Sequence, residues 1–198
     1  QTTFTQPLRN NTNTQQTLVY TITPISGTCT GTPFDLTVQV NPTPEIANES
    51  IAACSNAPIT YTATNGGGVN NNNIVPTNAL YTWTIKTDNA LITGKSAQST
   101  AQSTFTQTLK NTTNTPKDIV YTITPKSGTC TGTPFDLTVT VNPTPEIQAS
   151  APAICSGDAF TVTPANAGAT IVPANTTYTW TVAPNANVTG ETNQATPQ

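Results

Sequence analysis

The 198-residue chain contains no histidine and no methionine, and only 8% of its residues are charged. Catalysis by Ser-His-Asp or Cys-His groups needs an imidazole, so both classes of active site are excluded. Six cations are scattered without forming a basic patch, and the formal net charge is −3. This distribution argues against nucleic acid as a partner. We therefore expect neither an enzyme nor a nucleic-acid-binding protein.

Long apolar runs and metal-binding motifs are missing as well. No run approaches the roughly 20 apolar residues that a bilayer-spanning helix needs, so we expect no membrane insertion in this segment. The four cysteines are Cys29, Cys54, Cys130 and Cys155, and none belongs to a Cys-x-x-Cys pair. We expect no metal and no cofactor. Structural disulfides in an oxidising, extracellular setting are the interpretation that these cysteines favour.

What the sequence does contain is threonine-rich segments in which apolar residues take every second position. Tyr81, Trp83 and Ile85 alternate with threonines, and Phe135, Leu137, Val139 and Val141 alternate with polar residues. The same period appears in 59–63, 105–109 and 119–123. Strict alternation indicates strands with one apolar face. Such strands are typical of two sheets packed face to face, so the predicted fold is an all-β sandwich.

An internal repeat organises the chain. Residues 20–46 and 121–147 are identical at 25 of 27 positions, at an offset of 101. The Tyr-Thr-Trp-Thr motif at 81–84 returns at 178–181, at an offset of 97. A long tandem array of similar units is the usual origin of such similarity.

Two Asn-Pro-Thr-Pro segments, at 41–44 and 142–145, mark the boundaries between units. Paired prolines interrupt ladder hydrogen bonds and stiffen a linker. We expect a complete domain at 43–142, the C-terminal half of a preceding repeat at 1–42, and the N-terminal half of a following repeat at 143–198. The start, Gln1-Thr2-Thr3, is then a window cut from a longer protein or a processed product. A half-sandwich cannot bury its apolar face alone, so either the parent chain supplies the missing halves or neighbouring chains donate strands; we favour the first.

Large side chains at the alternating positions are the candidate core. A tryptophan in a middle strand and a tyrosine in the penultimate strand are features of the immunoglobulin sandwich. Burial habits favour packing over catalysis or ligand binding for these aromatics. The predicted core residues are Trp83, Tyr121, Phe135, Leu137 and Trp180.

Several motifs resemble one family. They are Cys-Ser-Gly at 155–157, Tyr-Thr-Trp-Thr at 81–84, Val-Tyr-Thr-Ile-Thr-Pro at 120–125, Gly-Thr-Cys-Thr-Gly-Thr-Pro-Phe at 128–135 and Val-Asn-Pro-Thr-Pro at 141–145. Together they resemble the PKD-like, immunoglobulin-like tandem repeats of giant cell-surface adhesins of Bacteroidetes. These proteins are exported by type IX secretion and include gliding-motility adhesins. The resemblance implies an extracellular, cell-surface location and a role in adhesion, and it transfers no catalytic residue. One departure is Asn56, where the motif has the glycine seen at Gly157.

The family pattern of two cysteines per domain implies a Cys54–Cys130 disulfide. Immunoglobulin topology sets the first loop and the last hairpin at opposite ends, which instead makes each cysteine face a neighbouring domain across a junction. Both alternatives remain open from sequence, and under either one Cys29 and Cys155 pair outside this window.

The leading functional hypothesis is a structural stalk segment of a long adhesin filament, projecting an adhesive tip for surface attachment or gliding. Its partners are the neighbouring repeats of the same chain, with surface polysaccharide or the substratum as further partners. One alternative is a carbohydrate- or surface-binding repeat module. The other is a filament subunit that polymerises by half-domain (donor-strand) exchange.

Overall fold

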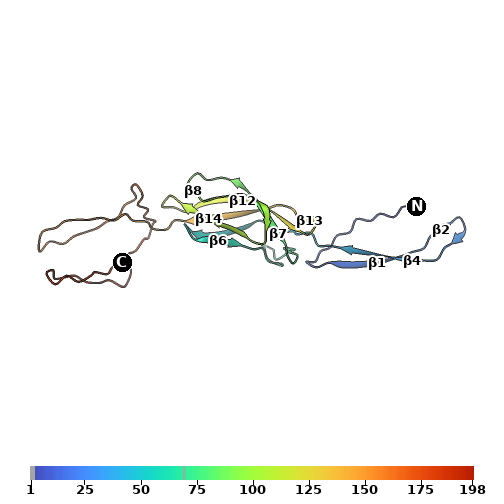
Figure 1. The fold of residues 1–198 in the computed structure, drawn as a ribbon, viewed down its shortest axis with the longest axis horizontal. Helices are drawn as coiled ribbons and strands as arrows, with labels where there is room; N and C mark the ends of the chain where they lie inside the picture. The colour runs from blue at the N-terminus through green and yellow to red at the C-terminus, as the bar shows by residue number, and fades with distance from the viewer. Residues whose placement is uncertain (1–2, 69) are drawn as a thin grey trace.

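The computed structural model describes residues 3–68 and 70–198, and within them it contains fourteen strands and no helix. The predicted all-β sandwich is therefore confirmed. Figure 1 shows an elongated molecule, with a sandwich in the middle, a thin hairpin at the N-terminal end and an open, extended segment at the C-terminal end. No helix among these residues has the length and apolar character needed to cross a membrane.

The main sheet of the sandwich has the strand order β5-β14-β12-β7-β9. All its neighbours are antiparallel except β5 and β14, which run parallel. A short strand, β13, extends the β12 end as a hairpin. The bounds are β5 (Glu49–Cys54), β7 (Leu80–Thr87), β9 (Gln98–Gln102), β12 (Lys117–Ser127), β13 (Cys130–Thr131) and β14 (Phe135–Asn142).

The facing layer consists of two antiparallel strand pairs. The first joins β6 (Pro58–Tyr61) to β10 (Phe105–Thr108), and the second joins β8 (Ile92–Thr93) to β11 (Lys110–Asn111). The segment predicted as a strand at 105–109 corresponds to β10, which ends at Thr108, and β11 follows it with a different partner. Their apolar side chains close over the main sheet.

The core lies between these layers and follows the period of two in β12 and β14. Tyr121 and Leu137 are paired across the two strands and are completely buried. Phe105, from the facing layer, packs edge-on against Tyr121 with ring centroids 4.9 Å apart and lies 5.0 Å from Trp83. Of the predicted core residues, Trp83, Tyr121, Phe135 and Leu137 are at most 4% exposed. Each such side chain contributes about 1.5–3 kcal/mol on burial.

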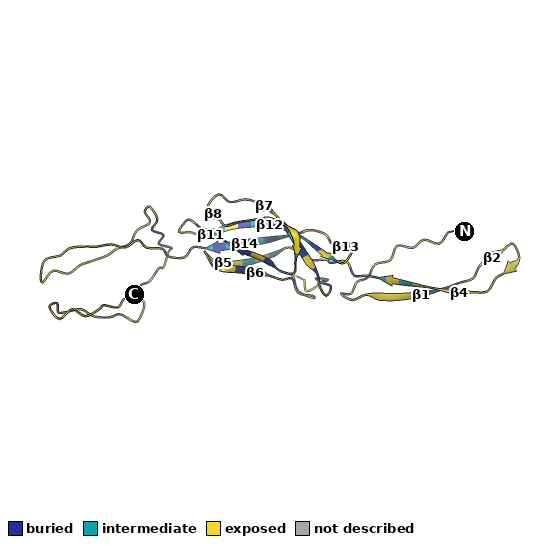
Figure 2. Ribbon diagram, viewed as in Figure 1, coloured by how far each residue is buried: buried dark blue, intermediate teal, exposed yellow. Residues whose placement is uncertain are grey.

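Residues 3–42 form a separate hairpin. It contains β1 (Gln16–Ile22), β2 (Ile25–Ser26), β3 (Cys29–Thr30) and β4 (Phe34–Val40). The β1–β4 register pairs Tyr20 with Leu36, just as β12 and β14 pair Tyr121 with Leu137. The local fold of the repeat is therefore reproduced, but no second layer covers it, and Figure 2 shows this hairpin largely exposed.

Residues 143–198 contain no strand, only isolated bridges. Trp180, which we expected in a core, is 48% exposed. Its equivalent, Trp83, is covered by Phe105 and by strands that follow it in the repeat. Residues 143–198 hold no equivalent of Phe105 or of β12, so the placement of Trp180 in a core is corrected.

Asn56 occupies the position where the second copy has Gly157. Its φ is 65° and that of Gly157 is 93°, so both adopt the left-handed region. Asparagine is among the few residues that enter this region at modest cost. The departure from the family motif therefore leaves the direction of the turn intact.

Candidate functional site at the repeat junctions

The chain passes out of one unit and into the next at Thr43-Pro44-Glu45 and again at Thr144-Pro145-Glu146. Glu45 exchanges two backbone hydrogen bonds with Ile74, at 2.9 and 2.8 Å. Glu146 exchanges the same pair with Ile171, at 2.9 and 2.6 Å. Each linker is thus paired to a loop of the following unit, which fixes how that unit begins.

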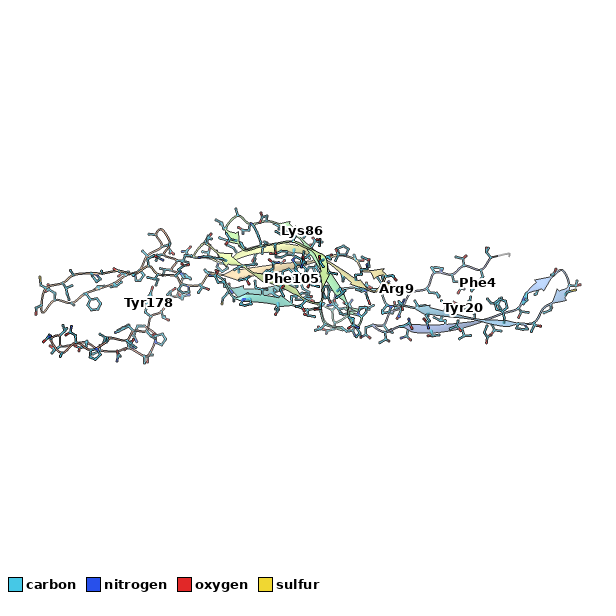
Figure 3. The ribbon with its side chains drawn as sticks, in the orientation of Figure 1. Phe4, Arg9, Tyr20, Lys86, Phe105 and Tyr178 are labelled. Carbon is cyan, nitrogen blue, oxygen red and sulfur yellow. The ribbon has the colours of Figure 1, made fainter. Side chains whose placement is uncertain are left out.

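Each linker glutamate also meets a cation from the preceding unit. The Arg9 guanidinium, labelled in Figure 3, pairs with Glu45, and Lys110 Nζ lies 3.1 Å from Glu146 Oε2. The four side chains are 41–70% exposed, and solvent-exposed pairs contribute only about 0–1 kcal/mol. These pairs orient one unit against the next and add little to its stability.

A buried asparagine ties the loop before the penultimate strand to the end of the last strand. Asn111 is 1% exposed, and its Nδ2 donates to the carbonyl oxygens of Thr115 and Val141, at 2.8 Å each. Its Oδ1 accepts from the backbone N–H and the hydroxyl of Thr113, at 2.9 and 2.8 Å. All four side-chain bonds recur at Asn10. Sequence reasoning missed this residue, although its recurrence at the repeat offset was a usable signal.

The complete sandwich has two distinct ends. At the exit end, Ser55 N–H donates to the carbonyl of Asn142 at 2.8 Å, and Thr144 Oγ1 donates to the carbonyl of Ser55 at 3.1 Å. At the entrance end, the hairpin after β12 lies against the incoming linker so closely that a Cβ on Gly132 would be 2.2 Å from the Pro44 oxygen. Only glycine fits there.

Cys54 and Cys130 lie at these two ends, and both are free thiols. Cys54 is paired in register with Asn142 at the exit end, whereas Cys130 is paired with Ser127 at the entrance end. The eight residues of β14 separate these ends by about 25 Å at 3.3 Å per residue. A disulfide needs Cα atoms within about 7 Å. Of the two alternatives that the sequence left open, the Cys54–Cys130 bond is therefore wrong for this fold, because the two residues flank opposite ends of β14.

Three tyrosine hydroxyls, those of Tyr61, Tyr81 and Tyr121, are buried without a hydrogen-bond partner among the described residues. Burial raises the pKa of all three, and raises that of Tyr121 to about 12 with a smaller contribution from the charge of Asp88. These phenols stay neutral near pH 7. Tyr121 therefore acts as a packing residue.

The carboxylates serve surface contacts. Lys86 hydrogen-bonds to Asp136 at 2.5 Å and lowers the pKa of that carboxyl, and Lys95 does the same for Asp88. In residues 3–68 and 70–198, no three side chains among Asp, Glu, Cys and His come together in a way that could hold a metal ion. What the described side chains form is an equivalent set of contacts at each of the two linkers.

Comparison with known proteins fits this picture. A family model described as "PKD-like domain" matches residues 1–44, 52–145 and 152–198. No curated protein matches the chain. The two gaps between the matched segments fall just after the two linkers.

Proposed function

Because the chain belongs to the PKD-like domain family, whose members are sandwich modules typical of extracellular proteins, we propose that it is a stalk segment of a long cell-surface adhesin. In this proposal residues 43–142 are one repeat, and 1–42 and 143–198 are halves of the neighbouring repeats. The stalk projects an adhesive tip for attachment or gliding, and the parent protein is of the Bacteroidetes type exported by type IX secretion. Its partners are adjoining repeats, with surface polysaccharide or the substratum at the tip.

The observation that carries this proposal is that the two linkers, at 43–45 and 144–146, make equivalent contacts. The same glutamate pairs with a preceding cation, the same backbone ladder joins it to the following loop, and the same buried asparagine fixes the last strand. Equivalent contacts at successive junctions favour the same orientation for each unit, and such an array forms a semi-rigid rod. With 11 residues in β12 at about 3.4 Å each, every repeat adds roughly 35–45 Å of length.

The aromatic side chains favour a spacer over a ligand-binding repeat. Every aromatic residue in 43–142 is buried or half-buried. Exposed aromatics occur only in the flanking segments, at Phe4, Phe34, Phe160 and Trp180. The equivalents of Phe4, Phe34 and Trp180 in the complete sandwich, Phe105, Phe135 and Trp83, lie in the core. A complete repeat therefore offers no aromatic platform for a sugar ring.

The intact mass of the parent protein tests the stalk. We expect hundreds of kilodaltons under denaturing, reducing conditions, with protease treatment of whole cells removing the protein from their surface. A parent of 20.6 kDa, the mass of this chain alone, would contradict a single-chain stalk. Micromolar binding of the chain to surface polysaccharide would favour the binding-module alternative instead.

A further inference from the structure

Cys54 lies at the exit end of the complete sandwich, on the outer face of the main sheet. It is exposed, whereas the preceding residue, Ala53, packs against the core, because successive residues of a strand point to opposite faces. In the parallel pairing of β5 with β14 the register partner of Cys54 is Asn142, which opens the second Asn-Pro-Thr-Pro segment. Neighbouring strands are about 4.8 Å apart. Cys54 therefore stands beside the chain that leads into the following repeat.

Two hydrogen bonds hold the turn after Cys54 against that segment. The Ser55 N–H donates to the carbonyl of Asn142 at 2.8 Å, and Thr144 Oγ1 donates to the carbonyl of Ser55 at 3.1 Å. The position of Cys54 is thus set relative to the linker as well as to β14.

Cys130 lies at the entrance end, in a hairpin that projects beyond the main sheet. The register of β12 with β14 stops at Ile123 and Phe135, so the hairpin between them extends past the end of β14. Figure 1 shows β13, which begins with Cys130, at the end of the sandwich that faces residues 3–42. The hairpin therefore carries its half-buried cysteine toward the preceding repeat.

The incoming chain runs alongside this hairpin. A Cβ on Gly132 would be 2.2 Å from the Pro44 oxygen, and Thr133 lines a cavity of about 350 Å³ together with Asn41. Toward the preceding repeat, Cys130 is two residues beyond Gly132, and Asn41 is three residues beyond Pro44. At about 3.3 Å per residue, these steps are roughly 7 and 10 Å. Cys130 therefore reaches nearly the same height along the molecule as Asn41.

The repeat brings the two cysteine positions to one junction. Asn41 is the equivalent of Asn142 at the offset of 101. The cysteine that follows β5 in the preceding repeat therefore stands beside Asn41, as Cys54 stands beside Asn142. Cys130 approaches the same asparagine from the other side of the linker.

We infer that consecutive repeats are joined by a disulfide, between the cysteine after β5 of one repeat and the hairpin cysteine of the next. Cys54 then bonds to the following repeat and Cys130 to the preceding one, with the Cα atoms within the roughly 7 Å that a disulfide needs. The inference rests on the tandem array of the proposed function and deepens it, since it names the covalent partner at each junction. A complete repeat has one cysteine at each end, so the bonds bridge every proline linker along the array.

Formation of each bond needs an oxidant, and a low-molecular-weight disulfide such as glutathione disulfide supplies it by thiol–disulfide exchange. One cysteine thiolate attacks the glutathione disulfide and expels a glutathione thiolate. The second cysteine thiolate attacks the protein sulfur of the mixed disulfide and expels the other glutathione thiolate. Two protein thiols are thus oxidised to one disulfide, and the two glutathione thiolates take up the two protons that the cysteines lose.

Two copies of the chain fused in frame provide two internal junctions for the test. Gln198 exchanges two backbone hydrogen bonds with Tyr178, at 3.0 Å each. Their equivalents in the complete sandwich, Gln102 and Tyr81, are paired in register. Gln1 is also the equivalent of Gln102, so a fusion in which Gln198 is followed directly by the second residue of the other copy continues the repeat. The fused chain holds three complete repeats in a row and eight cysteines, four from each copy.

Peptide mapping identifies the bonds, after incubation with glutathione disulfide, alkylation of the free thiols and proteolysis of the monomeric fraction. We expect Cys54 of the first copy bonded to Cys29 of the second, and Cys155 of the first copy bonded to Cys130 of the second. The other four cysteines should be alkylated. The sequences around the four cysteines differ, so each peptide can be assigned. Bonds within one repeat, from Cys54 to Cys130 or from Cys155 to Cys29, overturn the inference.

A matched pair of serine variants tests the assignment. Cys54→Ser in the first copy should abolish the bond to Cys29 and leave the Cys155–Cys130 bond in place. Cys130→Ser in the first copy is the control, because the repeat that would hold its partner is not part of the fused chain. Both bonds should therefore form in the control, and loss of either one there contradicts the pairing.

The cross-link and the stalk fail by different results. Tryptophan fluorescence in urea, measured on the reduced fused chain, checks that its repeats are folded. Folded repeats with all eight thiols alkylated overturn the cross-link and leave the stalk in place, whereas a parent protein of 20.6 kDa overturns the stalk.

Discussion

The side chain of Asn111 links the loop at 112–115 to the last residues of β14, at one end of the complete sandwich. Its amide makes four hydrogen bonds, to Thr113, Thr115 and Val141, and its own backbone N–H donates to Ser55 Oγ at 3.0 Å. Because Asn111 is almost fully buried, removal of its amide takes a donor from the buried carbonyl of Val141, whereas the carbonyl of the exposed Thr115 keeps the Thr113 hydroxyl at 3.0 Å. An unsatisfied buried polar group costs about 1–3 kcal/mol.

We predict that Asn111→Ala lowers the free energy of unfolding by about 1–3 kcal/mol, because the buried Val141 carbonyl loses its amide donor. Urea denaturation followed by Trp83 fluorescence measures this change. Asn114, exposed in the same loop, is the matched control, and its alanine variant should change stability by no more than about 0.5 kcal/mol. Equal effects of the two substitutions would show that the asparagine network is not what holds this loop.

At the residue scale, the sequence predicted the burial of side chains wherever burial follows from the period of a strand alone. Trp83, Tyr121 and Leu137 stand at alternating positions, and the structure places them in the core. Asn111 escaped prediction because its bonds join residues that are 30 positions apart as well as four apart. Trp180 has the same local sequence as Trp83, but burial depends on strands that are distant along the chain.

At the element scale, two hairpins with nearly the same sequence have different packing. β1 and β4 repeat the register of β12 and β14, so the hairpin itself is determined locally by alternation and by its turn. Only the second hairpin lies under a facing layer. The parallel pairing of β5 with β14, and with it the wide separation of Cys54 from Cys130, was not predictable because alternation does not indicate which strands become neighbours.

This duplication provides an internal control for packing. We predict that Leu137→Ala destabilises the central sandwich by about 2–5 kcal/mol, because it opens a cavity in a dense core. In dilute solution Leu36→Ala, in the identical Phe-Asp-Leu-Thr-Val segment of β4, should leave that unfolding transition unchanged within about 0.5 kcal/mol. Thermal and urea unfolding of both variants give the comparison. A large effect at Leu36 in monomeric protein would mean that the hairpin packs against the central sandwich.

For the whole molecule, the three buried tyrosine hydroxyls determine how stability responds to alkaline pH. The fold raises the pKa of Tyr61, Tyr81 and Tyr121, so it favours their neutral forms. Their contribution to stability is complete below pH 10, where tyrosine ionises in the unfolded chain. This contribution is lost as the pH rises through the pKa values of the folded state. The folded-state pKa of Tyr121 is about 12.

We therefore predict that the free energy of unfolding falls steeply above pH 10, by at most about 1.4 kcal/mol per pH unit for each of the three tyrosines. Urea midpoints measured between pH 8 and pH 11.5 test this. Tyr121→Phe should flatten the alkaline slope and keep or raise stability at pH 7, because it removes an unpartnered hydroxyl. An unchanged slope in this variant would assign the alkaline transition to other groups.

The parallel pairing of β5 with β14 has a mechanical consequence. The polypeptide enters the sandwich just before β5 and leaves it directly after β14, so a pull on the two ends draws these adjacent strands in opposite directions along their length. The six residue pairs between them are then loaded together in shear rather than opened one after another. A repeat built this way resists extension most strongly along the line that joins its two ends.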